Sequence, residues 1–125
     1  MPLEPGLSAT VSLDVDDEDT ALAFHSGQVA VLATPRLIAL CEEASLRAVD
    51  GRVPAGHTTV GMRVQLDHLA PTAVGTKVVA EATLEKVEGR RLTFTVSATD
   101  ERGLVAAGKV TRVVVDVERF LEKCS

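Results

Sequence analysis

The sequence is poor in aromatic residues: it has three phenylalanines and neither tryptophan nor tyrosine. Its apolar share is nevertheless 46%, so the core must be built from Val, Leu, Ala and Ile. At 125 residues the chain is long enough to bury one such core and too short for two. We expect a single domain spanning residues 1–125.

Cysteine is also scarce. Cys41 and Cys124 are far apart and follow no disulfide or metal-binding spacing, so we expect neither a disulfide framework nor a zinc site. Gly56 and Gly61 have the spacing of a phosphate-binding loop, but the Lys-Ser or Lys-Thr that should follow is missing. The sequence therefore predicts no metal ion and no bound cofactor.

Basic clusters and long apolar runs are missing as well. The formal net charge is −5 at pH 7, and without a basic stripe the chain is not expected to bind nucleic acid. No apolar run approaches the length of a membrane-spanning helix, and no basic-then-apolar leader begins the sequence. We expect a soluble, cytoplasmic protein with no membrane partner.

One segment, Thr34 to Val49, has the pattern of a long helix. Thr34 is a good N-cap, Pro35 suits the first helical position, and Asp50-Gly51 ends the segment. At about 100° per residue its polar side chains fall on one narrow stripe. That stripe is made of Arg36, Glu43, Arg47 and Asp50. Almost every other direction is apolar, so the rest of the chain should wrap this helix.

Glu42 is the exception. It projects roughly 120° away from the polar stripe, among apolar side chains such as Ile38 and Leu46. Because burying a carboxylate without a role costs several kcal/mol, this position indicates either a functional group or an acid satisfied by a backbone N–H. Glu43 points to the polar stripe and is expected at the surface.

Alternating apolar and polar residues predict five strands. They cover Leu7 to Val15, His57 to His68, Lys77 to Val87, Leu92 to Thr99 and Leu104 to Val117, and a short helix from Val117 to Lys123 closes the chain. Successive strands joined by tight turns pair antiparallel, and they must wrap the one apolar helix. This α+β architecture is the hotdog fold. It leaves apolar surface and strand edges uncovered, so we also expect a homodimer or a larger homo-oligomer.

The strand from His57 to His68 has two faces. The apolar face carries Thr58, Val60, Met62, Val64, Leu66 and His68. His68 is therefore predicted to point inward. Gly61 and His57 fall on the polar face, where His57 is expected to be exposed.

Thr34, Glu42 and His68 are three reactive side chains with a plausible common meeting point. Thr34 begins the helix, where backbone N–H groups and the helix dipole favour a developing negative charge. Each residue also has a purely structural interpretation: Thr34 as an N-cap, Glu42 as a satisfied buried acid, and His68 as a capped strand end.

Other polar groups carry weaker signals. The acidic run from Asp14 to Asp19 is expected to be a solvated connection. His25 could line an entrance, although a histidine in a loop is usually solvated. Arg63 and Arg90 could meet the phosphates of a ligand, but charged residues at such positions are more often simply exposed.

The sequence resembles the fluoroacetyl-CoA thioesterase group of hotdog proteins from about Val31 to Phe120. The resemblance rests on joint spacing and on one closely matching stretch. The matching positions are Ala33-Thr34, Glu42, Gly61, His68, Gly75, Val87-Glu88-Gly89-Arg90-Arg91-Leu92 and Val96-Ser97-Ala98. It implies an acyl-CoA thioesterase whose catalytic trio falls on Thr34, Glu42 and His68, with Gly61 at the bound thioester and coenzyme A as part of the substrate.

One segment departs from this group, which has a phenylalanine-bearing lid just before its threonine. Here the segment is His25-Ser26-Gly27-Gln28-Val29-Ala30-Val31-Leu32, with Phe24 as the one nearby aromatic residue. We therefore do not expect selectivity for the fluorinated substrate to carry over, and predict a small acyl-CoA thioester instead.

Two other functions remain open. The first is a non-catalytic hotdog protein that binds acyl-CoA or another small ligand and uses Thr34 and Glu42 for capping and packing. The second is a hydratase or dehydratase, which would pair an acid with a histidine. Asp67 and His68 are the nearest such pair, but neighbouring strand residues point to opposite faces.

Overall fold

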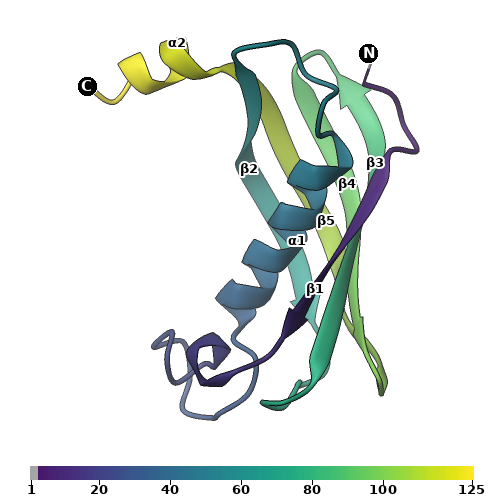
Figure 1. Ribbon diagram of the computed structural model, residues 1–125, viewed down its shortest axis with the longest axis vertical. Coiled ribbons are helices and arrows are strands. Elements are labelled where there is room, and N and C mark those ends of the chain that lie inside the picture. Colours follow the sequence, from purple (N-terminus) through teal and green to yellow (C-terminus); the bar gives the residue numbers. More distant parts are fainter. Residues whose placement is uncertain (1–2) are drawn as a thin grey trace.

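The computed structural model describes residues 3–125 and consists of a curved antiparallel sheet with a long helix against its concave face (Figure 1). The strands are β1 (Ser8–Asp14), β2 (His57–His68), β3 (Lys77–Glu88), β4 (Arg91–Asp100) and β5 (Gly103–Asp116). The helices are α1 (Thr34–Ala48), α2 (Val117–Glu122) and a 3-10 helix, η1 (Asp17–Asp19). The predicted α+β hotdog architecture is confirmed, and each predicted strand and helix lies within one residue of its observed bounds.

The strand order in the sheet is β1-β3-β4-β5-β2, and every neighbouring pair is antiparallel. β3, β4 and β5 pair in succession, as their tight turns predicted. β2 does not pair with β3, so that part of the expected succession was wrong: it pairs with β5 at the far edge. The connection 69–76 can span about 26 Å, whereas crossing three strand spacings takes about 14 Å.

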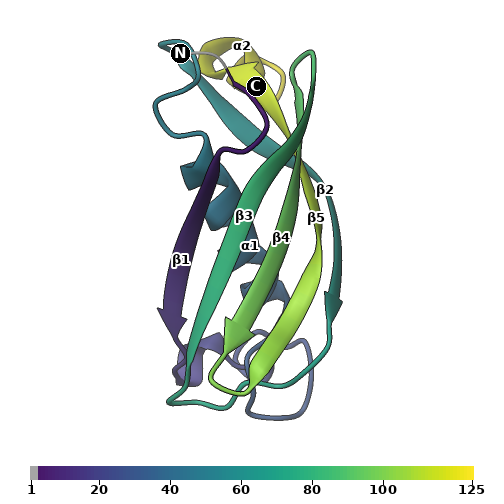
Figure 2. The ribbon, with the colours of Figure 1, turned by 90° about the vertical axis from the view of Figure 1, so that its right-hand side faces the viewer.

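The core lies between α1 and the concave face of the sheet, mainly against β1 and β3. Figure 2 shows the opposite, convex face, with α1 behind the sheet. Phe94 is the largest fully buried side chain, and apart from Cys41 the other fully buried apolar residues are aliphatic. The core is therefore built from the small and branched side chains that the composition required.

The outer side of α1 is open. The buried side carries Leu37, Leu40, Cys41, Ala44 and Ala48, while Leu46 is 41% exposed and Ala39 is exposed as well. The sequence predicted that the rest of the chain surrounds this helix on nearly every side. Within a single chain this was wrong, because one sheet covers only one side of a helix. The Glu42 side chain, on this open side, is 32% exposed.

The first residue of α1 is Thr34, and Ala33 is the N-cap, without a side-chain cap hydrogen bond. The prediction that Thr34 caps the helix was wrong by one position, and Pro35 consequently lies one residue further into the first turn. Since no side chain caps the helix, its first backbone N–H groups are left for another acceptor. Gly51, with a φ of 74°, follows the end of α1 as expected.

A β-bulge interrupts the alternation of β2. Gly61 pairs with Arg112, and Arg63 pairs with Thr111, so Met62 is the extra residue. The bulge reverses the faces before it: Thr59 is buried and Gly61 faces α1. The predicted inward positions of Thr58 and Val60 were therefore wrong, whereas His68, after the bulge, lies inward as predicted.

The segment before α1 is a loop tied down at both ends. Asp19 accepts a hydrogen bond from Arg36 at 3.0 Å, and its backbone carbonyl accepts one from Ala33 N–H at 2.8 Å. Thr20 and Leu32 form an isolated antiparallel bridge. The prediction of a solvated acidic run was wrong for Asp19, which is buried with its carboxylate accepting hydrogen bonds from Arg36 and from the Asp16 backbone N–H.

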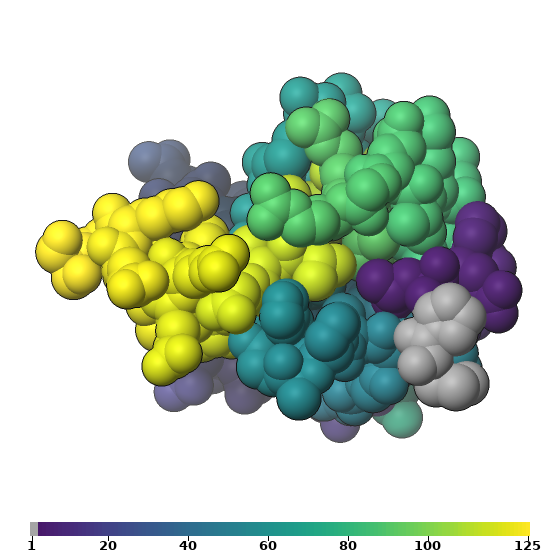
Figure 3. All heavy atoms as spheres, turned by 90° about the horizontal axis from the view of Figure 1, so that it is seen from above, coloured from purple at the N-terminus to yellow at the C-terminus, as the bar shows by residue number. Residues whose placement is uncertain are grey.

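α2 projects from one end of the sheet, where β2 begins and β5 ends (Figures 1 and 3). Asp116 caps it by accepting a hydrogen bond from the Arg119 backbone N–H. None of the helices formed by residues 3–125 is both long and apolar enough to cross a membrane.

Candidate functional site

Thr34 and His68 meet at the first turn of α1. The Thr34 hydroxyl Oγ1 lies 2.7 Å from His68 Nδ1, within hydrogen-bond distance. The two side chains come from the start of the helix and the last residue of β2, as predicted. Thr34 is the first helical residue, and its hydroxyl faces the histidine. The pairing of a hydroxyl with an imidazole allows a proton to pass between them.

The second ring nitrogen of His68 is free. Nε2 is buried and has no hydrogen-bond partner within residues 3–125. Burial lowers the pKa of the imidazole, and a backbone interaction with Ala70 opposes this effect. The neutral ring is therefore favoured, and neutral imidazole is the form that accepts a proton.

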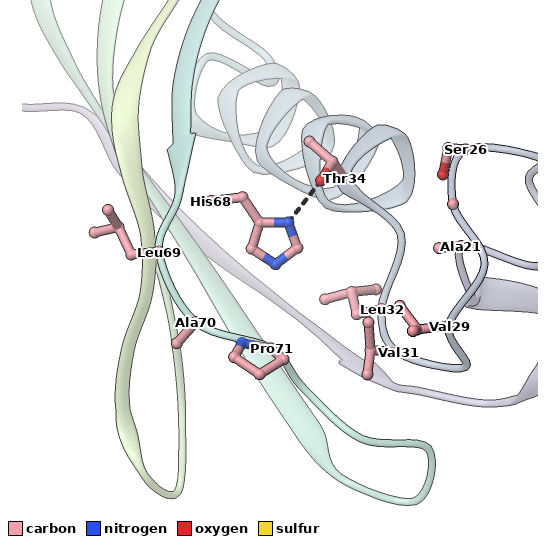
Figure 4. A pocket seen from close by; sticks show the side chains of 11 residues that line it. Ala21, Ser26, Val29, Val31, Leu32, Thr34, His68, Leu69, Ala70 and Pro71 are labelled. Atoms are coloured by element: carbon pink, nitrogen blue, oxygen red, sulfur yellow. Dashed lines mark hydrogen bonds between the residues drawn. The ribbon is translucent and has the colours of Figure 1, made fainter.

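A pocket of about 320 Å³ opens beside this pair. Figure 4 shows the His68 ring between Thr34 on one side and Leu32 and Pro71 on the other. Small and aliphatic side chains form most of the wall, with no aromatic residue other than the imidazole. The lining residues are Ala21, Ser26, Gly27, Val29, Val31, Leu32, Thr34, His68, Leu69, Ala70 and Pro71.

Glu42 lies in a second cluster. Its Oε2 accepts a hydrogen bond from Arg112 Nη1 at 3.0 Å. Thr34 and Glu42 are separated by eight residues of one helix, or about 12 Å along its axis. Thr34, Glu42 and His68 were predicted to share one meeting point. Within this chain Thr34 and His68 do meet, but Glu42 lies two turns further along the helix.

Gly61 belongs to the Glu42 cluster. A Cβ at this position would collide with Glu42 Oε2 and lie 3.7 Å from Arg112 Nη1. A side chain at this position would therefore displace the carboxylate from its place beside Arg112. The sequence placed Gly61 on the polar face; the Met62 bulge turns it toward α1.

Sequence reasoning missed Arg112. Its side chain is only 8% exposed, which is unusual for an arginine. A signal was available: Arg112 interrupts the otherwise apolar and hydroxyl-bearing run from Val110 to Val114. Arg112 alternates with Val110 and Val114, which are buried, and a charge buried on that face needs a partner; Glu42 is the partner found.

The remaining candidates lie outside both clusters. Glu43 forms a surface ion pair with Arg47 at 2.8 Å, as its place on the polar stripe predicted. His57 is half-buried rather than exposed, and its Nδ1 lies 3.1 Å from the Ala55 carbonyl oxygen. Asp67 is exposed on the opposite side of β2 from His68. No group of histidine, cysteine and acidic residues within 3–125 could hold a metal ion.

The model of one protein family, the fluoroacetyl-CoA-specific thioesterases, matches residues 15–118. The chain belongs to this family. A curated relative, the fluoroacetyl-CoA thioesterase of Streptantibioticus cattleyicolor, is 36% identical over 93 residues, covering 74% of this chain and 67% of the relative.

Solved structures of family members and other hotdog proteins are closely similar. A mutant of the fluoroacetyl-CoA-specific thioesterase, in complex with fluoroacetate and CoA, is 29% identical with a TM-score of 0.88, covering 94% of this chain and 99% of the other. A hot-dog-like protein from Thermanaerovibrio acidaminovorans is 25% identical with a TM-score of 0.89, covering 98% of this chain and 90% of the other.

Proposed function

We propose that this protein hydrolyses the thioester of a small acyl-CoA, with Thr34, Glu42 and His68 as catalytic residues. The observation that carries the proposal is the hydrogen bond between Thr34 Oγ1 and His68 Nδ1, made at the open end of a helix in a chain of this family. A thioesterase needs a nucleophile, a base and donors for the carbonyl oxygen.

The carbonyl oxygen of the thioester would lie near the start of α1. The first-turn N–H groups have no side-chain cap, and the helix dipole adds a partial positive charge there. Hydrogen bonds from these groups would stabilise the negative charge that develops on this oxygen when the carbonyl carbon is attacked.

Two routes lead to hydrolysis. In the first, His68 takes the Thr34 hydroxyl proton, Oγ1 attacks the carbonyl carbon, the C–S bond breaks, and the thiolate leaves with that proton; water then releases the acyl group. In the second, Glu42 takes a proton from water, whose oxygen attacks the carbonyl carbon directly; the C–S bond then breaks, and the thiolate leaves with the proton from Glu42. The short contact between Thr34 and His68 supports the first, and detection of an acylated Thr34 by mass spectrometry would distinguish them.

The acyl group would occupy the pocket beside His68. Its volume of about 320 Å³ is at the small end for ligand pockets, which suits a short acyl chain. Phe24, the aromatic residue nearest in sequence, does not line it. We therefore propose that the enzyme does not discriminate strongly between acetyl and fluoroacetyl thioesters.

Coenzyme A carries phosphates that require cationic partners. A groove of about 570 Å³ between α2 and the β3–β4 turn is lined by Arg90, Arg119 and Lys123, in a chain whose net charge is negative. This groove lies where β2 begins, at the opposite end of that strand from His68, so Arg90 would meet the phosphates of a coenzyme A that runs across the surface between subunits. Arg63 is exposed on β2 and does not line the groove.

The working form would be a homodimer. The outer side of α1 exposes Leu46, β2 is an edge strand, and its bulge residue Met62 is 42% exposed. A second copy covering this surface would bury the apolar residues and exclude water around Glu42, which one chain leaves partly exposed. Analytical ultracentrifugation of the wild type and of Met62→Asp tests this assembly.

A non-catalytic acyl-CoA binding protein is the alternative. The observation that favours it is the ion pair between Glu42 and Arg112, which gives Glu42 a structural partner two turns from Thr34. Such a protein would bind acyl-CoA in the same pocket and release no thiol.

The decisive experiment follows thiol release from acyl-CoAs of increasing chain length, including acetyl-CoA and fluoroacetyl-CoA. Hydrolysis predicts that Glu42→Gln and His68→Ala lose turnover while Glu43→Gln, the neighbouring acid on the same helix, retains it. Binding without thiol release at any chain length would exclude the proposal and support the binding protein.

A further inference from the structure

One polar residue is buried in the connection that follows β2. Within residues 69–76 Thr72 alone is buried, at 1% exposure, while its neighbours Pro71 and Ala73 are exposed. Its hydroxyl is paired: Oγ1 donates a hydrogen bond to Asp100 Oδ2 at 3.0 Å. Because a buried hydroxyl without a partner costs free energy, Asp100 stabilises Thr72 in this position.

Asp100 is itself fixed at the turn between β4 and β5. It is the last residue of β4 and pairs with Gly103, the first residue of β5. Its second carboxylate oxygen, Oδ1, accepts a hydrogen bond from the Arg102 backbone N–H at 2.8 Å. One oxygen is thus bound by the turn and the other by Thr72, and the two bonds together define the orientation of the side chain.

The backbone of Thr72 makes a second connection, toward the helix. Its carbonyl oxygen accepts a hydrogen bond from Leu32 N–H at 2.9 Å, and the next residue, Ala73, forms an isolated antiparallel bridge with Val31. The side chain of Thr72 therefore ties the connection 69–76 to the β4–β5 turn. Its backbone ties the same connection to the segment that leads into α1.

Both segments that Thr72 joins form walls of the pocket beside His68. Figure 4 shows Pro71, from one segment, and Leu32, from the other, on the same side of the His68 ring. Neither Thr72 nor Asp100 lines the pocket, so their hydrogen bond can act on a bound acyl group only through these walls. The wall residues of the two segments are Val31, Leu32, Leu69, Ala70 and Pro71.

We propose that Thr72 and Asp100 are positioning residues that determine specificity: their hydrogen bond holds the two wall segments together and so limits the length of acyl chain that the pocket admits. This inference rests on the proposed function. It assigns to neither residue a contact with substrate or a part in the chemical step. One extra methylene is worth about 10–200-fold in a hydrophobic pocket, so walls that yield should relax the preference for short chains.

The test measures kcat and KM for acetyl-CoA and hexanoyl-CoA in two variants that break the bond. Thr72→Val removes the hydroxyl with little change in shape, and Asp100→Ala removes its acceptor. We expect each to lower the ratio of kcat/KM for acetyl-CoA to that for hexanoyl-CoA about tenfold or more, chiefly through a lower KM for hexanoyl-CoA. Thr72→Ser retains the hydroxyl and should keep the wild-type ratio.

Thr95→Val is the matched control, because Thr95 also donates its hydroxyl to a carboxylate, Glu85 Oε2 at 2.7 Å, but at an exposed position of β4. A general loss of activity lowers the turnover of both substrates and leaves their ratio unchanged, so the ratio separates a specificity role from a merely structural one. Circular dichroism and thermal unfolding identify variants that have lost the fold. Asp100 is only half-buried, so Asp100→Ala tests the bond even where Thr72→Val unfolds.

The double variant Thr72→Val with Asp100→Ala should be no more relaxed in chain length than either single variant, because all three lack the same hydrogen bond. A folded Thr72→Val or Asp100→Ala with the wild-type ratio would overturn the inference while leaving an active thioesterase. So would additive effects in the double variant, a Thr72→Ser as relaxed as Thr72→Val, or a wild type that hydrolyses both substrates equally well. Wild-type protein that releases no thiol would instead remove the proposed function, and the specificity role with it.

Discussion

Thr34 and His68, 34 positions apart in the sequence, are joined by a 2.7 Å contact between hydroxyl and imidazole. The contact ties the start of the central helix to the end of an edge strand. The N-cap of that helix, Ala33, has no side chain that can accept a hydrogen bond, which leaves the first-turn N–H groups open. In the proposed mechanism this pair would supply a nucleophile with its base, next to donors for the oxyanion.

The pH dependence of hydrolysis should reflect His68. Burial lowers the pKa of its imidazole, so the ring stays neutral, and able to accept a proton, below the usual value of about 6.5. We expect the acid limb of kcat/KM to have its midpoint below that value. His57→Ala should leave the profile unchanged, and a midpoint above the ordinary histidine pKa would contradict the assignment of His68 as base.

Gly61→Ala should disturb Glu42 specifically. The added methyl collides with the carboxylate, so we expect a loss of about 1–3 kcal/mol in unfolding free energy together with reduced turnover. In a Glu42→Ala background the space is vacant, and the stability cost should largely disappear. Chemical denaturation of the four proteins measures this difference; equal costs in both backgrounds would show that the strain lies elsewhere.

Asp19 should stabilise the loop before α1 in a pH-dependent way. Burial of its carboxylate would raise the pKa, but hydrogen bonds from the Asp16 backbone and from Arg36, with the Arg36 charge, outweigh this and lower it. A lowered folded-state pKa contributes stability above the unfolded value of about 3.9. That contribution is lost as pH falls through the folded-state pKa.

We therefore expect Asp19→Asn to lower the free energy of unfolding by about 1–2 kcal/mol at neutral pH, and the difference from wild type to shrink under acid conditions. Thermal unfolding across this pH range measures both effects. Glu43→Gln, which breaks an exposed pair, serves as the control and should have almost no effect. A difference that grows with acid would contradict the proposed sign.

The two cysteines should differ sharply in reactivity. Burial, with the nearby charge of Glu42, raises the pKa of the Cys41 thiol to about 11, whereas Cys124 is exposed. A native sample treated with iodoacetamide near neutral pH should take up one label at Cys124, and a denatured sample two. Intact mass of wild type and Cys124→Ser measures this; native labelling of Cys41 would show that α1 opens readily.

Local patterns were sufficient to predict the elements. Alternation located the strands, and helix-forming residues with a breaker at Gly51 located α1, because both signals depend on neighbours in sequence. The place of β2 at the far edge could not be read in this way. Tight turns determine which strands pair in succession, but the connection 69–76 is long enough to allow several partners.

The candidate site was predictable only in part. The inward direction of His68 followed from alternation after the bulge, and Thr34 from its place at the helix start. Arg112 was missed because its partners, Glu42 and Thr59, are 70 and 53 positions away in the chain. No periodicity within β5 reports such contacts.

The bulge at Met62 makes the length of β2 as important as its composition. If the strand kept Met62 but paired without the bulge, the side chains before that point would change faces. Thr58 and Val60 would then replace Thr59 and Gly61 opposite α1, taking Thr59 away from Arg112 and Gly61 away from Glu42. One extra residue therefore determines which side chains face α1 in both halves of the strand. Thr59 and Gly61 face it before the bulge, and His68 faces inward after it.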